Sequence, residues 1–258
     1  ASPTVSMVNG VSVSTGCWPA RHGIVGNRFF DPDRGLYDHS SDPGWLADCQ
    51  HLQAVAEEQG VRAAAFGWYG DTSDAEGQIA SFVGEVEYPC DEPDDGGRAA
   101  EVEALLGRGD RAPRLVLAYF CGPDEAQHFQ GIDSVATEEA VRGSDEIVGR
   151  LRRALEALPS TRRGALLVTT DHGMTPVSTL VNLPRIMRKR GVAGRVASND
   201  GIAYVYLDDP VTAAAARVAL DAHPQLRAYT HDASSFLRIG HSPRVGDLVV
   251  VVDATDGD

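Results

Sequence analysis

Five short apolar runs, separated by stretches of helical periodicity, constrain the fold of this chain more than any other feature. Turn-forming residues bound each run, which is typical of strands buried on both faces of a parallel sheet. Strands that alternate with helices predict an α/β fold, a mainly parallel sheet flanked by helices on both faces. The expected strands are residues 61–67, 114–120, 165–170, Ile202–Leu207 and Leu248–Val252.

The helical pattern is clearest in residues 138–158, where Ile147, Leu151 and Leu155 recur at helical spacing. Residues 46–59, 99–106 and 211–222 show similar patterns, whereas the acidic, turn-rich stretch 84–97 predicts an exposed loop. A length of 258 residues with 43% hydrophobic residues suits one sizeable core. We therefore expect a single domain over residues 1–258, with a small, less regular subdomain within 177–244.

The charge balance narrows the class of function. The formal net charge is −14, from 37 acidic and 23 basic residues, which argues against binding to a nucleic-acid polymer. An acidic chain is compatible with a divalent-cation site. The single lysine, Lys189, excludes a Walker-type phosphate loop. No apolar run approaches a membrane span and no targeting segment is visible, so both a cytoplasmic and an exported location stay open.

The four cysteines are widely spaced and form no C-x-x-C pair, which excludes a zinc ribbon or a thioredoxin-type motif. We expect buried thiols, with one disulfide as the alternative if the protein is exported.

Two Asp/His pairs follow expected strands. Asp171 and His172 come directly after residues 165–170, and Asp124 and His128 stand four apart just past residues 114–120. Ligands bind beyond the carboxyl ends of parallel strands, and carboxylate and imidazole groups are ligands of zinc-like metals. Each pair alone is equally typical of a helix cap beside a surface histidine. Two pairs at equivalent places favour metal binding.

Ser6 lies where a turn leads into an expected helix, a position where free N–H groups and the helix dipole favour a negative charge. A nearby metal would make this hydroxyl a nucleophile. The common alternative is an ordinary N-cap. Asn27 could donate its amide to a phosphoryl oxygen or simply occupy a turn, whereas His22 suits a structural role. Residues 10–14 (Gly-Val-Ser-Val-Ser) nearly imitate the nucleophile elbow of a serine hydrolase, a weaker rival.

Taken in order, these segments resemble the nucleotide pyrophosphatase/phosphodiesterase branch of the alkaline-phosphatase superfamily, with phosphonoacetate hydrolase as a close relation. Residues 3–9 read Pro-Thr-Val-Ser-Met-Val-Asn, residues 15–16 read Thr-Gly, and residues 22–27 read His-Gly-Ile-Val-Gly-Asn. Asp-x-x-x-His at residues 124–128 and Thr-Asp-His-Gly-Met at residues 170–174 follow in the same order as in that branch.

The resemblance implies an alkaline-phosphatase-like fold and two divalent metal ions, usually zinc. Asp124 and His128 would bind one metal, and Asp171 and His172 the second, with Ser6 bridging toward it. Ser6 would attack phosphorus in line and form a phospho-serine intermediate, which water then hydrolyses. Asn27 would stabilise the phosphoryl group.

The resemblance also implies two ligands that this sequence lacks: an Asp at the end of a strand upstream of Ser6, and a His after Leu248–Val252. We therefore expect an internal piece of a longer enzyme, without the first strand and the C-terminal ligand segment, or an inactive product.

Three functions stay open on this evidence. The first is hydrolysis of phosphodiester or pyrophosphate bonds in a small phosphate ester or nucleotide. The second is hydrolysis of phosphonates or phosphate monoesters at the same site, and the third is a non-catalytic role. Phe29, Phe30, Trp68 and Tyr69 could stack on a nucleotide base or pack in the core. The oligomeric state is open.

Overall fold

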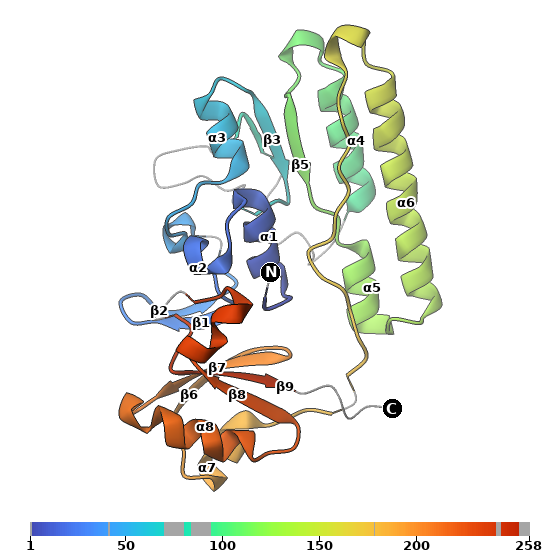
Figure 1. Ribbon diagram of the computed structural model, residues 1–258. Coiled ribbons are helices and arrows are strands. Elements are labelled where there is room, and N and C mark those ends of the chain that lie inside the picture. Colours follow the sequence, from blue (N-terminus) through green and yellow to red (C-terminus); the bar gives the residue numbers. More distant parts are fainter. Residues whose placement is uncertain are drawn as a thin grey trace. The chain divides into compact units, whose positions relative to one another are not determined.

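The computed structural model describes residues 2–40, 42–69, 80–83, 94–177, 179–240 and 244–252. The chain divides into two compact units, and the ribbon in Figure 1 follows each of them. Unit 1 comprises residues 1–49 and 178–258, and unit 2 comprises residues 50–177. Each unit is described below by itself.

Unit 2 is built on a three-stranded parallel sheet in the order β4-β3-β5. Successive side chains of a strand point to opposite faces, and β3 shows this clearly. Its Ala64 and Phe66 pack against helices α4 and α6, whereas Ala63 and Ala65 pack toward Ala56 of helix α3. Helices therefore cover both faces, as predicted. The elements are α3 (Leu52–Glu58), β3 (Ala63–Phe66), β4 (Phe82–Val83), α4 (Asp95–Leu106), β5 (Leu115–Ala118), α5 (Gly122–Gln130) and α6 (Val135–Glu156).

Capping side chains explain where the two long helices of unit 2 begin. The carboxylate of Asp94 accepts the backbone N–H of Gly97 at the start of α4, and the Ser134 hydroxyl accepts that of Thr137 in α6. The expected helices 99–106 and 138–158 are confirmed, with earlier starts. Of the expected loop 84–97, residues 84–93 lie outside the described residues, and residues 95–97 form the first turn of α4.

The prediction of a strand at residues 165–170 is wrong. These residues have no strand assignment and are exposed, with Leu167 86% and Val168 66% accessible. A strand needs a hydrogen-bonding neighbour, and in the described part of unit 2 no strand pairs with this run. An apolar run is therefore not sufficient for a strand.

Unit 1 contains a four-stranded antiparallel sheet in the order β6-β7-β9-β8. The strands at Ile202–Leu207 and Leu248–Val252 were predicted to the residue, but they pair antiparallel with one another instead of joining a parallel sheet. The prediction of a less regular region at 177–244 is also wrong, because it holds most of this sheet and two helices. The elements are α7 (Leu183–Lys189), β6 (Gly194–Asn199), β7 (Ile202–Leu207), α8 (Ala213–Asp221), β8 (Leu226–Thr230) and β9 (Leu248–Val252).

The two faces of this sheet bury different partners. On one face, strands β7, β8 and β9 pack against Met187 of α7 and Leu220 of α8. On the other, the Tyr204 hydroxyl donates to the carbonyl of Val25, and the Tyr206 hydroxyl accepts the N–H of Phe30. The N-terminal segment thus packs on the sheet through alternate residues of β7. Its elements are α1 (Ser6–Thr15), α2 (Pro19–His22) and the hairpin strands β1 (Arg28–Asp31) and β2 (Gly35–Asp38).

The expectation of free thiols is wrong for the described cysteines. Cys17 and Cys49 form a disulfide in unit 1, and none of the described cysteines is a free thiol. Sequence spacing could not reveal this pair, because 32 residues separate the two cysteines.

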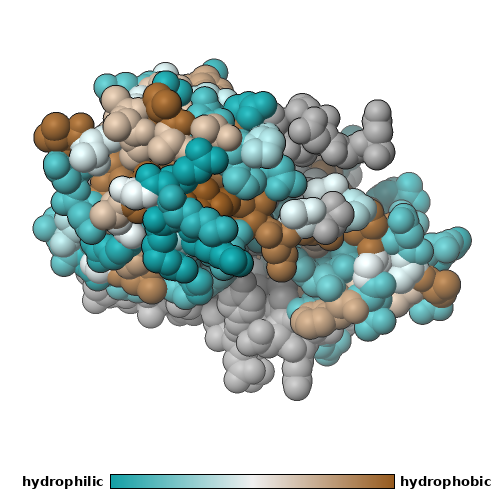
Figure 2. Space-filling model, turned by 90° about the horizontal axis from the view of Figure 1, so that it is seen from below, coloured by the Kyte–Doolittle hydropathy of each residue, from teal (hydrophilic) through white to brown (hydrophobic). Residues whose placement is uncertain are grey.

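No helix formed by the described residues is both long and apolar enough to cross a bilayer. The face in Figure 2 carries hydrophilic side chains with hydrophobic residues scattered among them. Val211, just before α8, and Val218, in α8, are exposed apolar residues. Single exposed apolar side chains are normal on a protein surface.

Candidate active site

Ser6 is the first residue of α1, as the sequence predicted. Val5 precedes it in an extended conformation and serves as the N-cap without a side-chain hydrogen bond. The free N–H groups of the first turn therefore lie beside the Ser6 hydroxyl. One of them is already used, because Met7 donates its N–H to Asn27 Oδ1 at 3.0 Å. The structure thus brings Asn27 to the start of α1.

A second asparagine, not identified from the sequence, holds the backbone beside Asn27. Asn199, at the end of β6, is 3% exposed. Its side chain accepts the N–H of Arg28 and donates to the carbonyl of Arg28, both at 2.9 Å. A Cβ atom at Gly26 would lie 2.4 Å from Asn199 Oδ1, so only glycine fits this close approach. Gly26 and Asn199 together fix the backbone on both sides of Asn27.

Asp124 and His128 lie one turn apart on α5, which begins just past β5. Their side chains approach to 3.6 Å, between Asp124 Oδ2 and His128 Nε2, as the four-residue spacing predicted. The Asp95 carboxylate accepts the N–H groups of Cys121 and Gly122, at 3.1 and 2.8 Å, and so anchors the start of α5. The alternative of a helix cap does not apply to Asp124, because Cys121 is the N-cap.

Asp171 and His172 lie in an irregular segment, so Asp171 is not a helix cap either. Nε2 of His172 lies 4.0 Å from Asp124 Oδ1 and 3.8 Å from Asp171 Oδ2. The other ring nitrogen, Nδ1, lies 3.0 Å from the carbonyl oxygen of Gly173. A backbone partner at Nδ1 is the usual way to hold a histidine for binding through Nε2. The structure therefore brings together all four metal-ligand candidates of unit 2.

Tyr119 is a further residue of this cluster that sequence reasoning missed. It follows β5 directly, and its hydroxyl donates to Asp171 Oδ2 at 3.1 Å. Burial raises the pKa of Tyr119, and the neighbouring Asp171 charge raises it further. The hydroxyl therefore stays protonated near neutral pH and acts as a donor that orients the carboxylate.

The cluster fits a zinc-like ion in the type of its donors, two carboxylates and two imidazoles. The carboxylate of Asp124 lies within 4.0 Å of both imidazoles. Across the described residues, however, no three His, Cys, Asp or Glu side chains already converge as a ready metal cage. Residues 124, 128, 171 and 172 are thus a partial donor set.

The comparisons with known proteins decide the family. Residues 1–255 match the family described as type I phosphodiesterase/nucleotide pyrophosphatase. The chain belongs to this family.

Individual relatives agree with this membership. An uncharacterised pyrophosphatase/phosphodiesterase of Schizosaccharomyces pombe is 28% identical over 203 residues, which are 76% of this chain and 41% of the yeast protein. Human ectonucleotide pyrophosphatase/phosphodiesterase family member 7 is 24% identical over 278 residues, 93% of this chain and 55% of that protein. The chain therefore spans about half the length of these relatives.

Solved structures confirm the alkaline-phosphatase-like α/β fold. Inactive murine ectonucleotide pyrophosphatase/phosphodiesterase 5, in complex with AMP, superposes with a TM-score of 0.81 at 22% identity, covering 97% of this chain and 67% of that one. Phosphonoacetate hydrolase from Sinorhizobium meliloti 1021, in complex with phosphonoformate, gives a TM-score of 0.68 at 20% identity, covering 97% and 70%.

Family membership and local geometry both argue against the alternative that Ser12 is the nucleophile of a serine hydrolase. Ser12 Oγ lies 2.9 Å from His22 Nε2, which looks like a catalytic dyad. However, His22 Nδ1 accepts the N–H of Ile24, so the ring proton belongs on Nε2 and points at Ser12. A histidine in that tautomer cannot take a proton from Ser12, whose hydroxyl donates to the carbonyl of Val8. The structural role expected for His22, which is fully buried, is consistent with this geometry.

Two of the four aromatic residues considered for base stacking lie in β1. Phe29 is fully buried and stacks on Tyr37, with ring centroids 4.4 Å apart, so it belongs to the core. Phe30 is half-buried and packs edge-on against Tyr206 at 5.2 Å.

The other two lie just past β3 in unit 2. Trp68 packs against the core beneath α3. The ring of Tyr69 lies 5.7 Å from the ring of Tyr119, whose hydroxyl bonds Asp171. Tyr69 therefore reaches the Asp/His cluster through the ring of Tyr119.

Proposed function

We propose that residues 1–258 act as one catalytic domain of a metal-dependent hydrolase that cleaves phosphodiester or pyrophosphate bonds in nucleotide-like substrates. The gathering of Asp124, His128, Asp171 and His172 just past β5, in a member of this family, carries the proposal. Two divalent cations would be held by the Asp124/His128 pair and the Asp171/His172 pair, and carboxylate and imidazole donors suit zinc.

Bound metals would supply Lewis-acid stabilisation of the negative charge on phosphoryl oxygens. The chain itself supplies the nucleophile. Ser6 Oγ forms a bond to phosphorus while the bond from phosphorus to the leaving oxygen breaks; the hydroxyl proton passes to solvent water, and the leaving oxygen takes up a proton from water. Water then attacks the phosphoserine and gives its hydroxide to phosphorus, the Ser6–phosphorus bond breaks, Ser6 Oγ regains a proton, and a phosphomonoester is released. The N-terminal end of α1 favours the charge that develops at Ser6.

Asn27 contributes by orientation. Its carbonyl oxygen is committed to the N–H of Met7, so the amide NH₂ is the end that remains to donate to a phosphoryl oxygen. Asn199 and Gly26 hold the backbone that carries it. A donor placed in advance stabilises charge without reorganisation during the reaction.

The test compares Ser6→Ala with Ser12→Ala in the whole protein. Wild type should hydrolyse thymidine 5′-monophosphate p-nitrophenyl ester, and Ser6→Ala should lower kcat by about 10³-fold or more, because the covalent route is lost. Ser12→Ala should stay near the wild-type rate. Intact activity in Ser6→Ala, or its loss only in Ser12→Ala, would refute the proposed nucleophile.

Substrate and metal measurements separate the remaining candidates. We expect faster turnover of the nucleotide diester than of p-nitrophenyl phosphate or phosphonoacetate, and the reverse order would indicate a monoester or phosphonate hydrolase. Metal analysis of the purified protein should find zinc or a similar cation, and a chelator should abolish activity that added Zn²⁺ restores. A protein that neither holds metal nor gains activity from it would have a non-catalytic role.

A further inference from the structure

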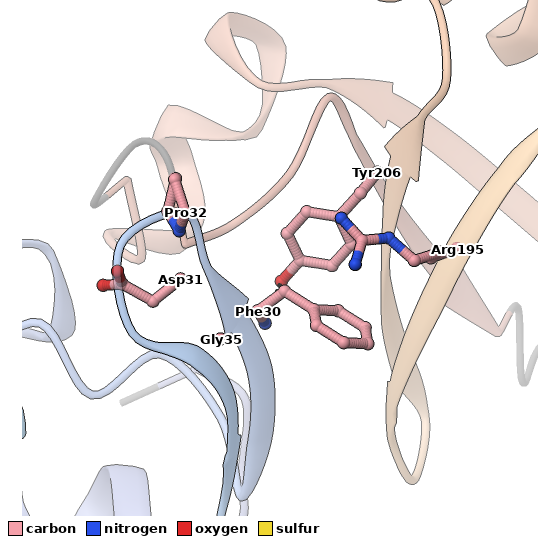
Figure 3. A pocket seen from close by; sticks show the side chains of 6 residues that line it. All are labelled: Phe30, Asp31, Pro32, Gly35, Arg195 and Tyr206. Atoms are coloured by element: carbon pink, nitrogen blue, oxygen red, sulfur yellow. Dashed lines mark hydrogen bonds between the residues drawn. The ribbon is translucent and has the colours of Figure 1, made fainter.

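Unit 1 contains a pocket of about 220 Å³ that the proposed reaction does not use. It lies between the β1–β2 hairpin and the strands β6 and β7 (Figure 3). Six residues line it: Phe30, Asp31, Pro32, Gly35, Arg195 and Tyr206.

Strand register places the side chains of this pocket. Arg195 of β6 and Tyr206 of β7 are directly opposite one another, so both side chains stand on the same face of the sheet. Phe30 lies against both: the Arg195 guanidinium sits 4.7 Å from its ring centroid, and the Tyr206 ring meets it edge-on at 5.2 Å. Figure 3 shows Arg195 reaching from its strand toward the two rings. The guanidinium is therefore held at a defined place by stacking.

The two charged groups of the pocket differ in their partners. The Asp31 carboxylate accepts Arg244 Nε at 2.7 Å and the N–H groups of Asp33 and Arg34, and these donors hold its pKa below the usual range despite burial. Its charge is thus neutralised. The guanidinium of Arg195, by contrast, forms no hydrogen bond or ion pair with any described residue and only stacks on Phe30.

The apolar walls restrict what can accompany an anion at Arg195. The Tyr206 hydroxyl already donates to the carbonyl of Arg244 and accepts the N–H of Phe30, so the tyrosine offers its ring and not its hydroxyl. Pro32 and Phe30 add further apolar surface. One guanidinium matches the two oxygens of a carboxylate, whereas a phosphate dianion would lack donors for its remaining oxygens.

We propose that this pocket is a binding site for a small carboxylate with a planar apolar body, such as an aromatic acid. The Arg195 guanidinium holds the carboxylate and the aromatic walls hold the body. The pocket volume lies below the range of roughly 300–1,000 Å³ typical of small-molecule sites, which favours a ligand smaller than a nucleotide. This proposal is independent of the phosphodiesterase reaction.

Isothermal titration calorimetry with benzoate tests the proposal on the full-length protein. We expect saturable binding of one benzoate, with acetate and inorganic phosphate binding more weakly. Arg195→Ala should weaken benzoate binding about 10-fold or more, because it removes a charge-assisted pair of hydrogen bonds. Arg188→Ala, which removes an exposed arginine of α7 in the same unit, should bind benzoate like wild type.

Arg195→Lys is a second variant for the case that Arg195→Ala misfolds. It keeps the positive charge but loses the planar guanidinium, which stacks on Phe30 and can bind a carboxylate through two hydrogen bonds. It should also bind benzoate more weakly than wild type while keeping the wild-type Tm. Absence of saturable benzoate binding, equal binding by wild type and either Arg195 variant, or tighter binding of phosphate than of benzoate would each overturn the assignment.

Discussion

At the residue scale, the Tyr119 hydroxyl is expected to orient one carboxylate of the Asp/His cluster. Its hydrogen bond to Asp171 orients a proposed metal ligand, and partners of this kind typically change metal affinity or activity by about 10- to 100-fold. We therefore expect Tyr119→Phe to lower kcat/KM on a nucleotide diester by about that factor without a large change in Tm. Tyr229→Phe, in unit 1, is the matched control and should keep full activity. Equal activities of the two variants would show that the hydroxyl has no positioning role.

Also at the residue scale, His51 links stability to pH. It is 7% exposed, and burial lowers its pKa from 6.5 to about 4. Between these values the unfolded chain binds a proton that the folded chain does not, so stability should fall as the pH drops from 6.5 toward 4. The full contribution is about 3 kcal/mol, because a pKa difference of one corresponds to about 1.4 kcal/mol.

Urea unfolding at pH 7 and pH 4.5 measures this contribution of His51. The wild type should lose more free energy of unfolding between the two pH values than His51→Gln, which cannot take up a proton. If both proteins lose the same amount, the buried histidine is not the cause.

At the element scale, the run at residues 165–170 gives a prediction about exposure. Leu167 is 86% exposed, whereas Leu151 of α6 is 7% exposed. Leu167→Thr should change the free energy of unfolding by less than about 0.5 kcal/mol, while Leu151→Ala should cost about 2–5 kcal/mol. Binding of a hydrophobic dye should also fall in Leu167→Thr, because an exposed apolar side chain is removed. A large loss of stability in Leu167→Thr would mean that this run is buried.

The same elements show which parts of the fold a sequence can predict. The strand Ile202–Leu207 was predicted to the residue, because a dense apolar run between turns is a local signal. Leu248–Val252 was also predicted to the residue, but its antiparallel pairing with Ile202–Leu207 was not predictable, because pairing depends on distant parts of the chain. Residues 165–170 carry an equally strong local signal and form no strand in the absence of a described neighbour. Local pattern therefore predicts candidate strands, and tertiary pairing selects among them.

The site follows the same division between local and long-range information. Asp124 and His128 could be paired from sequence because a helix brings positions four apart to one face. The roles of Tyr119 and Asn199 could not be predicted from sequence. Tyr119 bonds a residue 52 positions away, and Asn199 bonds one 171 positions away. Family resemblance bridges part of this gap, since ordered motifs carry long-range information that periodicity lacks. It named the proposed ligands but not the residues that orient them.

At the scale of the whole molecule, the disulfide between Cys17 and Cys49 constrains unit 1, whose two segments are separated in sequence by all of unit 2. Closing a loop of 32 residues removes conformational freedom from the unfolded chain, an effect of about 3–4 kcal/mol. We expect the double variant Cys17→Ser/Cys49→Ser to lose about this free energy in urea unfolding, chiefly in the transition of unit 1. Peptide mapping without reductant should recover residues 17 and 49 as one cross-linked pair. Free thiols at both positions in protein made under oxidising conditions, or a double variant as stable as wild type, would contradict this role.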